Sequence, residues 1–301
     1  MLLLIRPAAF ALNAQTAVNN YFQPEKVEDD VLSIQAAALS EFDALVDSLQ
    51  AADIETVVVQ DTTEPHTPDS IFPNNWVSFH EEGHVLYPMF AANRRLERSL
   101  DIWSALPPST CVLDLSDEEN HGRYLEGTGS LVLDRKHRVA YAALSARTHA
   151  DLVQRWCEVM RYTPVVFNAM QTVDGKRLPI YHTNVMMSVG EGFALWCPEC
   201  IDDAAERERV RQSLRTGNRE LIAISEEQMH SFAGNILQVF NRKNEPFILM
   251  SAAAEAALRG PALTALQHHG TILSSPIPTI ERYGGGSVRC MVAEWGVGTG
   301  D

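Results

Sequence analysis

A pattern of two strands, a helix and a third strand recurs along this chain, and it limits the folds that the chain can adopt. The first unit is predicted as strands 75–80 and 84–89, a helix over 94–106 and a strand over 111–115. Three more units follow in the same order, over 130–134, 138–144, 148–161 and 164–168; 184–190, 193–197, 202–215 and 221–225; and 236–240, 246–250, 252–260 and 271–275. The order of elements repeats, although no obvious sequence identity links the units.

The fifth unit is divided between the two ends of the chain. Its first strand is predicted over 290–295, and a strand over 2–7, a helix over 31–50 and a strand over 56–60 complete it. A ring closed by the two termini hides the edges of its sheets. The pattern therefore predicts an α/β fold, a five-bladed α/β propeller of five pseudo-repeated ββαβ units, forming a single domain over residues 1–301. A general α/β protein with one long mixed sheet is the alternative interpretation.

The charge of the chain restricts its partners. The sequence has 24 Lys and Arg against 39 Asp and Glu, which gives a net charge of −15, and it has no run of basic residues. Such a chain repels phosphate backbones, so we expect no nucleic-acid partner. We also expect no membrane partner and a cytoplasmic location, because no apolar stretch has the length of a membrane span and the start MLLLIRP is too short for a signal peptide. A small or zwitterionic substrate is compatible with this charge, and homo-oligomerisation stays open.

Each unit has polar residues immediately before its first strand. These are Asn75, Glu126, His182 with Asn184, Asn235 and Cys290, and equivalent members are 51 to 56 positions apart. In a ring of units, equivalent positions meet around one axis. We therefore expect these side chains to line one central pocket, although they are far apart in the sequence.

Three of these residues form a set that is suited to nucleophilic catalysis. A cysteine thiolate is a strong nucleophile when a base lies beside it. Histidine transfers protons near neutral pH, and a carboxylate can orient that histidine. Cys290, His182 and Glu126 thus supply a nucleophile, an acid/base and an electrostatic partner. In the alternative interpretation, Cys290 is simply a buried strand residue, as many cysteines are.

Five segments carry a resemblance to a known group of enzymes: PDSIFPNNW (68–76), LEGTGSLVLD (125–134), LSART (144–148), YHTNVMMSVG (181–190) and GGGSVRCM (284–291). In this order, the chain resembles the guanidino-group-modifying superfamily, which includes arginine deiminases, dimethylarginine dimethylaminohydrolases, succinylarginine dihydrolases and amidinotransferases. The resemblance covers essentially the whole chain. It implies a five-bladed α/β propeller and an enzyme that needs neither a metal nor an organic cofactor.

The resemblance also implies roles for individual residues. Cys290 matches the nucleophile that attacks the planar guanidino or ureido carbon. His182 matches the general acid/base, which protonates the leaving amine and then activates water. Glu126 matches the carboxylate that binds the terminal nitrogens of the substrate and supports the histidine.

Other matching positions are expected to hold the rest of the substrate. Asp69 matches an acidic residue that opens the first motif. Arg94 and Arg147 match arginines that bind the substrate carboxylate in dimethylarginine hydrolases, and a bidentate pair of this kind positions an amino acid well. The alternative for each arginine is an exposed charge at the start of a helix.

Two positions depart from the arginine deiminases, which have aspartates where this chain has Asn75 and Asn184. An amide both donates and accepts hydrogen bonds, so it suits a neutral ureido group better than a guanidinium cation. We therefore expect a hydrolase that converts citrulline to ornithine, ammonia and carbon dioxide. The open alternatives are a deiminase or dihydrolase of arginine or a modified arginine, an amidinotransferase, and a non-catalytic ligand-binding propeller. Succinylarginine dihydrolases carry Asn at the first position and still take a guanidinium.

Two further segments have more than one interpretation. The polar stretch 10–23 is either a lid over the substrate or an ordinary surface connection. Cys197 and Cys200, in CPEC, have the spacing of half a zinc site, but no second Cys/His pair at a suitable spacing accompanies them. We therefore expect no metal site.

Overall fold

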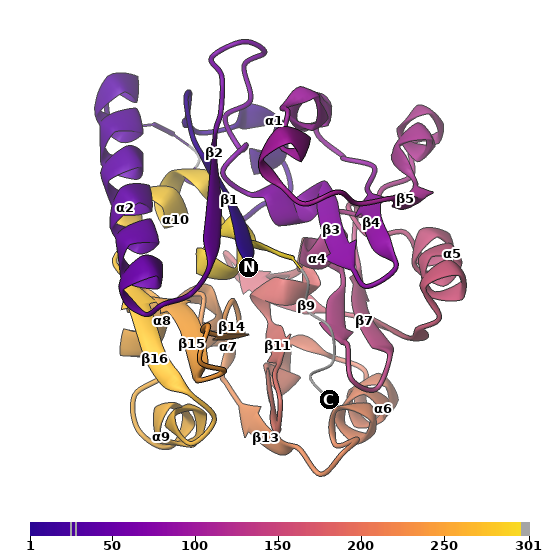
Figure 1. Ribbon diagram of the computed structural model, residues 1–301. Helices are drawn as coiled ribbons and strands as arrows, with labels where there is room; N and C mark the ends of the chain where they lie inside the picture. The colour runs from indigo at the N-terminus through magenta and orange to yellow at the C-terminus, as the bar shows by residue number, and fades with distance from the viewer. Residues whose placement is uncertain (25, 28, 296–301) are drawn as a thin grey trace.

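A computed structural model describes residues 1–24, 26–27 and 29–295 of the chain. Three-stranded sheets are its main element, and the long helices lie on the outside of the molecule with the strands inside (Figure 1). Four of the sheets use strands that are consecutive in the chain: β3 (Val77–His80), β4 (Gly83–Leu86) and β5 (Cys111–Asp114); β6 (Val132–Asp134), β7 (Val139–Leu144) and β8 (Thr163–Asn168); β11 (Met187–Val189), β12 (Phe193–Trp196) and β13 (Glu220–Ala223); β14 (Leu237–Phe240), β15 (Pro246–Ser251) and β16 (Thr271–Ser275).

The remaining three-stranded sheet joins the two ends of the described chain. It consists of β17 (Ala293–Glu294), β1 (Leu2–Arg6) and β2 (Thr56–Gln60), in that order. Leu3 pairs with Ala293 in the antiparallel direction and with Val57 in the parallel direction. The other four sheets have the same arrangement, since the first two strands of each are antiparallel and the third is parallel to the second.

Helical segments connect the second and third strands of each sheet. In the sheet of β17, β1 and β2, the helix α2 (Val31–Ala51) connects β1 to β2. In the other four sheets, taken in chain order, the connections are α3 (Ala92–Arg95) with the 3-10 turns η2 (Leu96–Ser99) and η3 (Trp103–Ala105), α5 (Ala150–Met160), α6 (Ala204–Leu214), and α8 (Ala252–Ala257) with α9 (Pro261–Gln267). The other helical segments are α1 (Ala14–Ala17), α4 (Gly127–Ser130), α7 (Glu226–His230), α10 (Pro278–Gly284), and the turns η1 (Pro73–Asn75), η4 (Ser116–His121), η5 (Thr183–Val185), η6 (Pro198–Cys200) and η7 (Val288–Met291). The result is a mixed α/β fold.

The longest helix shows how the sequence determines these elements. The side chain of Asp30 accepts a hydrogen bond from the Ser33 backbone N–H and so caps the N-terminus of α2. Its buried positions recur every three or four residues, at Ile34, Ala38, Phe42, Leu45, Val46 and Leu49. This stripe faces the core, because α2 contacts β1, β2 and β16.

The first strands of the sheets lie near one another in the interior. Strand β17 contacts β3, β6 contacts β11, and β11 contacts β14, while α4 contacts both β3 and β6. Strand β3 is buried along its whole length, as a strand with neighbours on both faces should be. The turns that precede these strands are therefore brought toward the middle of the molecule.

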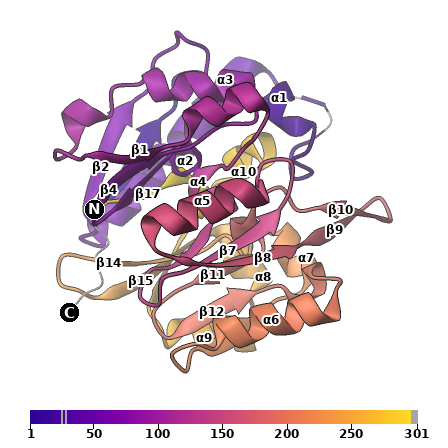
Figure 2. The ribbon, with the colours of Figure 1, turned by 90° about the vertical axis from the view of Figure 1, so that its right-hand side faces the viewer.

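Two elements differ from the sequence prediction. Residues 94–106 do not form one helix, because the backbone of Leu100 is extended and separates α3 and η2 from η3. Leu96 and Trp103 are exposed in this region, and Arg94 is buried. A hairpin of β9 (Met170–Val173) and β10 (Lys176–Pro179) was not predicted, and it projects from one side of the molecule (Figure 2).

No helix among the described residues is long and apolar enough to cross a membrane.

Candidate active site

Short helical turns carry most of the polar residues that precede the first strands. Asn75 ends η1, Glu126 and His182 are the N-cap residues of α4 and η5, and Cys290 lies in η7. All of these side chains are buried, as are those of Asn184 and Asn235. Residues from separate sheets thus meet in one polar cluster inside the molecule.

Cys290 is contacted by two amide side chains. The Nδ2 atom of Asn235 lies 3.3 Å from its Sγ, and that of Asn184 lies 3.5 Å away. The sequence placed Cys290 in a strand over 290–295, but η7 holds it and β17 begins only at Ala293. The turn aims the sulfur at the two amides, whereas a strand would place alternate side chains on opposite faces.

A buried carboxylate and an imidazole form the second pair of the cluster. Glu126 Oε2 lies 2.7 Å from Nε2 of His182, and the two side chains are 0% and 2% exposed. Burial lowers the pKa of His182 to about 4, although Glu126 opposes this shift. Burial by itself would raise the pKa of Glu126, but Arg147 and His182 together bring it well below its usual range. The resting pair is therefore a carboxylate beside a neutral imidazole.

The position of His182 requires a glycine in the opposite turn. A Cβ atom at Gly129 would lie 2.7 Å from Nδ1 of His182 and 2.6 Å from Nδ2 of Asn75. Both distances are shorter than non-bonded atoms tolerate, so any other residue at this position would displace one of the two side chains. The same geometry shows that Asn75 and His182 lie on either side of one glycine.

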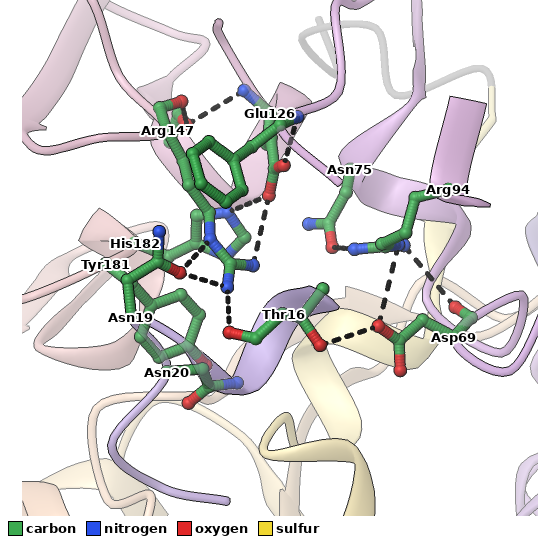
Figure 3. Close-up of polar contacts among 12 residues, drawn as sticks. Thr16, Asn19, Asn20, Asp69, Asn75, Arg94, Glu126, Arg147, Tyr181 and His182 are labelled. Carbon is green, nitrogen blue, oxygen red and sulfur yellow. Dashed lines mark hydrogen bonds and ion pairs between the residues drawn. The ribbon is translucent and has the colours of Figure 1, made fainter. Parts of the chain in front are cut away.

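Arg147 joins this pair to the N-terminal segment. Its Nη1 lies 3.4 Å from Oε2 of Glu126, and its Nη2 donates to the Thr16 carbonyl at 2.8 Å. Its Nε also donates to Oδ1 of Asn19 at 2.9 Å (Figure 3). The guanidinium lies over the ring of Tyr181, with 5.1 Å between its Cζ and the ring centroid. The 2% exposed side chain is not the exposed charge that the alternative interpretation required.

Asp69 also contacts the N-terminal segment, through Asn13 and Thr16. Its Oδ2 accepts hydrogen bonds from Nδ2 of Asn13 at 2.8 Å and from Oγ1 of Thr16 at 3.1 Å. Its Oδ1 is buried and has no hydrogen-bond partner among the described residues. Burial raises the pKa of this carboxyl group, although Arg94 opposes the shift. An unpartnered buried carboxylate oxygen is ready to accept from a donor group on a ligand.

Arg94 is held by the protein on most of its donor atoms. Glu97 accepts from Nε at 2.8 Å and from Nη2 at 3.0 Å, and Asn75 Oδ1 accepts from Nη1 at 2.7 Å. The Phe72 carbonyl accepts a further bond from Nη2 at 3.0 Å. Arg94 also lies 3.9 Å from Oδ2 of Asp69. A ligand carboxylate at Arg94 would have to share the guanidinium with Glu97.

The contacts group the residues selected from the sequence into two sets, Cys290 with Asn184 and Asn235, and Glu126, His182, Arg147, Asp69, Arg94 and Asn75. Asn184 and His182, two residues apart at η5, bring the two sets beside each other.

The structure also adds partners that the sequence did not reveal. Glu97 lies within the predicted helix over 94–106 and had no assigned role, although its spacing of three residues from Arg94 was an available signal. Thr16, Asn13 and Asn19 belong to the polar stretch 10–23, whose run of hydroxyl and amide side chains was noted without assigning contacts. Among the residues that the structure describes, no three His, Cys, Asp or Glu side chains are grouped so as to hold a metal ion.

Comparisons with known proteins agree with this arrangement. Residues 6–297 match the family model described as N,N dimethylarginine dimethylhydrolase, eukaryotic. No curated protein matches.

Solved structures with the same fold include ArgZ, an arginine dihydrolase from the ornithine–ammonia cycle in cyanobacteria. The full-length apo structure superposes with a TM-score of 0.73 at 18% identity, and the match covers 97% of this chain but 40% of that one. The chain thus spans about two-fifths of full-length ArgZ. It spans 98% of the ArgZ N-terminal domain that was solved bound to substrate, with a TM-score of 0.73 at 17% identity over 98% of this chain.

A DDAH from Pseudomonas aeruginosa is also similar. A cysteine-to-serine variant of that protein, in complex with citrulline, superposes with a TM-score of 0.67 at 16% identity, and the match covers 97% of both chains. At these identities, the likeness establishes the shared fold.

Proposed function

Because the chain belongs to the N,N-dimethylarginine dimethylhydrolase family, whose members hydrolyse C–N bonds within the guanidino-group-modifying superfamily, we propose that it hydrolyses citrulline to ornithine, ammonia and carbon dioxide. One observation carries the choice of citrulline. The polar side chains that contact the Cys290 sulfur are the neutral amides of Asn184 and Asn235, not carboxylates. A ureido group bound there is neutral, so it needs hydrogen-bond partners rather than compensating charges.

The proposed reaction begins with attack of the Cys290 sulfur on the ureido carbon. His182 rests as a neutral imidazole, so it can accept the thiol proton as the sulfur attacks. Glu126 then faces an imidazolium, which it stabilises across the 2.7 Å contact. The tetrahedral intermediate collapses as His182 returns the proton to the terminal nitrogen, which leaves as ammonia.

The second half-reaction releases the product. The intermediate is a thiocarbamate in which the former ureido carbon joins Sγ of Cys290 to the ornithine nitrogen. Water that has given a proton to His182 attacks this carbon and displaces the sulfur, and His182 then returns the proton to Sγ of Cys290. The released N-carboxy-ornithine loses carbon dioxide to give ornithine. Overall, citrulline and one water become ornithine, ammonia and carbon dioxide.

The ends of the substrate have partners of their own in this proposal. The unpartnered Oδ1 of Asp69 accepts from the α-ammonium group, and Arg147 is the cation closest to the Glu126–His182 pair. Arg94 contributes to the carboxylate subsite only together with Glu97, because Glu97 already accepts two of its hydrogen bonds.

We assign residues 10–23 to a lid. Thr16 and Asn19 hold Arg147, and Thr16 and Asn13 hold Asp69, so the segment bridges two proposed substrate-binding groups. A substrate that reaches these groups must exchange contacts with the segment. The lid is therefore expected to open for entry and to close again over the bound substrate.

We also propose that the five three-stranded sheets are the blades of a closed ring. The contacts between β17 and β3, between β6 and β11 and between β11 and β14 support this arrangement, as does the pairing of β17 with β1. A ring explains why turns from separate blades meet in one polar cluster.

Arginine is the second candidate, and a different observation favours it. Three carboxylates, those of Asp69, Glu97 and Glu126, are buried around the two guanidinium groups of Arg94 and Arg147. This leaves an excess negative charge that a cationic substrate would neutralise. Burial, however, raises the pKa of Glu97 to about 7 and also raises that of Asp69, so part of this charge is lost near neutral pH.

The test is to measure ammonia and ornithine release from citrulline and from arginine in parallel. We expect turnover of citrulline, and we expect Cys290→Ser to abolish it while the variant keeps the wild-type melting temperature. Turnover of arginine without citrulline would reject the argument from the neutral amides and retain the nucleophile. Turnover that survives in Cys290→Ser would reject the covalent mechanism.

A further inference from the structure

A cavity of about 750 Å³ lies behind the catalytic turns, along the first strands β6, β11 and β14. Asn184 and Thr128, from the turns η5 and α4, form part of its wall, and so does Arg289. Arg289 directly precedes Cys290 in η7, and Asn184 is one of the two amides that contact the Cys290 sulfur. The cavity therefore borders the catalytic cluster and shares Asn184 with it.

The lining of the cavity is basic, although the chain as a whole is acidic. Four Lys and Arg side chains line it, at Arg135, Lys136, Arg219 and Arg289, against the carboxylates of Asp134, Glu191 and Glu294. The chain carries a net charge of −15. A local excess of cations in a chain of this composition calls for a specific explanation.

The three arginines have only two carboxylate partners within the described residues. Arg219 Nη2 lies 2.5 Å from Oδ2 of Asp134, and both side chains are almost fully buried. Glu294 Oε2 accepts from Nη2 of Arg289 at 2.9 Å and lies 3.9 Å from Nη2 of Arg135. One carboxylate therefore serves two guanidinium groups, and Arg135, whose side chain is 15% exposed, is left 3.9 Å from a carboxylate that already accepts a hydrogen bond from Arg289.

Arg219 adds an independent observation at the same cavity. Its Nη1 is buried and has no hydrogen-bond partner among the described residues. The side chain is 4% exposed. A buried guanidinium nitrogen without an acceptor is costly, and a missing ligand is one of the usual reasons for such a group.

The rest of the lining is mixed, with polar side chains such as Ser188, Gln238 and Asn244 beside an apolar part. Leu131, Leu133, Met187, Val189, Ile236 and Val239 contribute to the apolar part. A cavity of this volume is in the range that holds small molecules, and its mixture of apolar walls with few charged groups is typical of ligand sites. The deficit of one carboxylate matches one negative charge on the ligand.

We propose that this cavity binds a small monocarboxylate with an apolar body, whose carboxylate supplies the counter-charge that Arg135, Arg219 and Arg289 lack. A carboxylate matches the planar fork of a guanidinium with two parallel hydrogen bonds. The proposal does not depend on the reaction catalysed at Cys290.

The test uses hexanoate as the probe, with its neutral amide, hexanamide, and inorganic phosphate as comparisons, in calorimetric titrations of the intact protein at low salt. We expect hexanoate to bind at least about 10-fold more tightly than hexanamide, because a hydrogen bond to a charged group contributes about 1.5–3 kcal/mol. We also expect it to bind more tightly than phosphate. Equal binding of hexanoate and hexanamide, or preferred binding of phosphate, would overturn the proposal.

Two neighbouring substitutions locate the site. Arg135→Met removes the cation that shares Glu294, so it should weaken hexanoate binding about 10-fold or more without lowering the melting temperature of the ligand-free protein. Lys136 also lines the cavity but is exposed, where solvent screens its charge, so Lys136→Met should weaken hexanoate binding much less than Arg135→Met does. Unchanged hexanoate binding in Arg135→Met would place the ligand elsewhere and reject the proposal. If Arg135→Met does not fold, the hexanoate and hexanamide comparison on the wild-type protein still decides the question of charge.

Discussion

Two amide donors converge on the sulfur of Cys290, and they define the chemistry available to that residue. The Nδ2 atoms of Asn184 and Asn235 lie 3.5 and 3.3 Å from Sγ. Hydrogen-bond donors at these positions can stabilise the negative charge that develops on the sulfur as its proton is transferred, because hydrogen bonds to a charged acceptor are stronger. Aspartates at the same positions would repel that charge. The amides therefore suit both a sulfur nucleophile and an uncharged substrate group.

Replacing one of these amides by a carboxylate should make Cys290 less reactive. We expect Asn235→Asp to slow alkylation of Cys290 by iodoacetamide at pH 7 by about 10- to 100-fold, which corresponds to the loss of one hydrogen bond to a charged group. The reason is that the substitution removes a donor and adds a negative charge beside the sulfur. Mass mapping of the labelled peptides measures the rate at each cysteine.

The chain contains its own reference for this measurement. Cys111 is exposed, whereas the other four cysteines are buried. Its rate of alkylation should be the same in the wild-type protein and in Asn235→Asp. If alkylation of Cys290 and Cys111 slowed together, or if Cys290 kept its wild-type rate, the amides would not control the reactivity of Cys290.

At the scale of the elements, the end of α10 supports the proposed lid. Gly285 follows this helix with φ of 63° and ψ of 24°, in the left-handed region. Its carbonyl accepts from Nδ2 of Asn20 at 3.1 Å, and Gln23 donates to the Tyr283 carbonyl at 2.9 Å. The segment 10–23 is thus fastened to the backbone that leads to Cys290.

A methyl group at Gly285 should loosen this attachment. Its Cβ would lie 2.4 Å from Nδ2 of Asn20 and 2.6 Å from Cγ of Gln23. We expect Gly285→Ala to increase hydrogen exchange across residues 13–23 and to lower the free energy of unfolding by more than the 1–2 kcal/mol or so that left-handed backbone costs a non-glycine residue.

Gly122 provides the matched control. It has φ of 65° and ψ of 28°, and a Cβ there would meet nothing within 4 Å. Gly122→Ala should therefore show the backbone strain alone, with unchanged exchange in residues 13–23. Equal effects of the two substitutions would contradict the idea that Gly285 is needed for contact with the lid.

The sequence predicted the order of the strands well, because each sheet consists of short apolar runs that are separated by turn residues. It failed where tertiary contacts outweigh the local pattern. The predicted helix over 94–106 is broken because Arg94 is buried against Glu97 and Asn75, which a surface helix would not allow. The hairpin at 170–179 could have been predicted from its Asp174–Gly175 dipeptide, which favours a tight hairpin turn. Both residues have positive φ in that turn.

The site was predictable to a similar extent. Equivalent positions before the first strands identified Glu126, His182 and Asn235, because a repeat converts distant sequence positions into neighbours. The spacing of Arg94 and Glu97 was compatible with their pairing, but the pairing of Arg147 with Asn19 was not predictable. The second contact depends on the path of segment 10–23, which no periodicity in the sequence predicts.

At the scale of the whole molecule, the two ends of the described chain complete one sheet. The backbone N–H of Trp295 donates to the carbonyl of Met1 at 2.9 Å, and β17 pairs with β1 across nearly the full length of the sequence. If the sheets form a closed ring, the point at which the chain begins is arbitrary. New ends placed in an exposed turn should then be tolerated, because few contacts would be lost there.

This leads to a test by circular permutation. Joining Asp301 to Met1 and opening the chain between Glu81 and Glu82, in the exposed turn between β3 and β4, should give a folded protein. Because Trp295 and Met1 are already hydrogen-bonded, residues 296–301 are long enough to connect them, since six residues span up to about 20 Å. We expect a single thermal transition within about 3 °C of the wild-type melting temperature, because about 1 kcal/mol shifts the melting temperature of a large domain by only about 2–4 °C.

A second permutant, opened between Asp174 and Gly175 in the turn of the β9–β10 hairpin, is the matched comparison. This turn also lies on the surface, but the hairpin is outside the five three-stranded sheets. Both permutants should therefore fold and should alkylate Cys290 at the wild-type rate. A permutant opened at 81–82 that fails to fold, beside one opened at 174–175 that does fold, would mean that the first sheet needs its chain order and would contradict five equivalent blades.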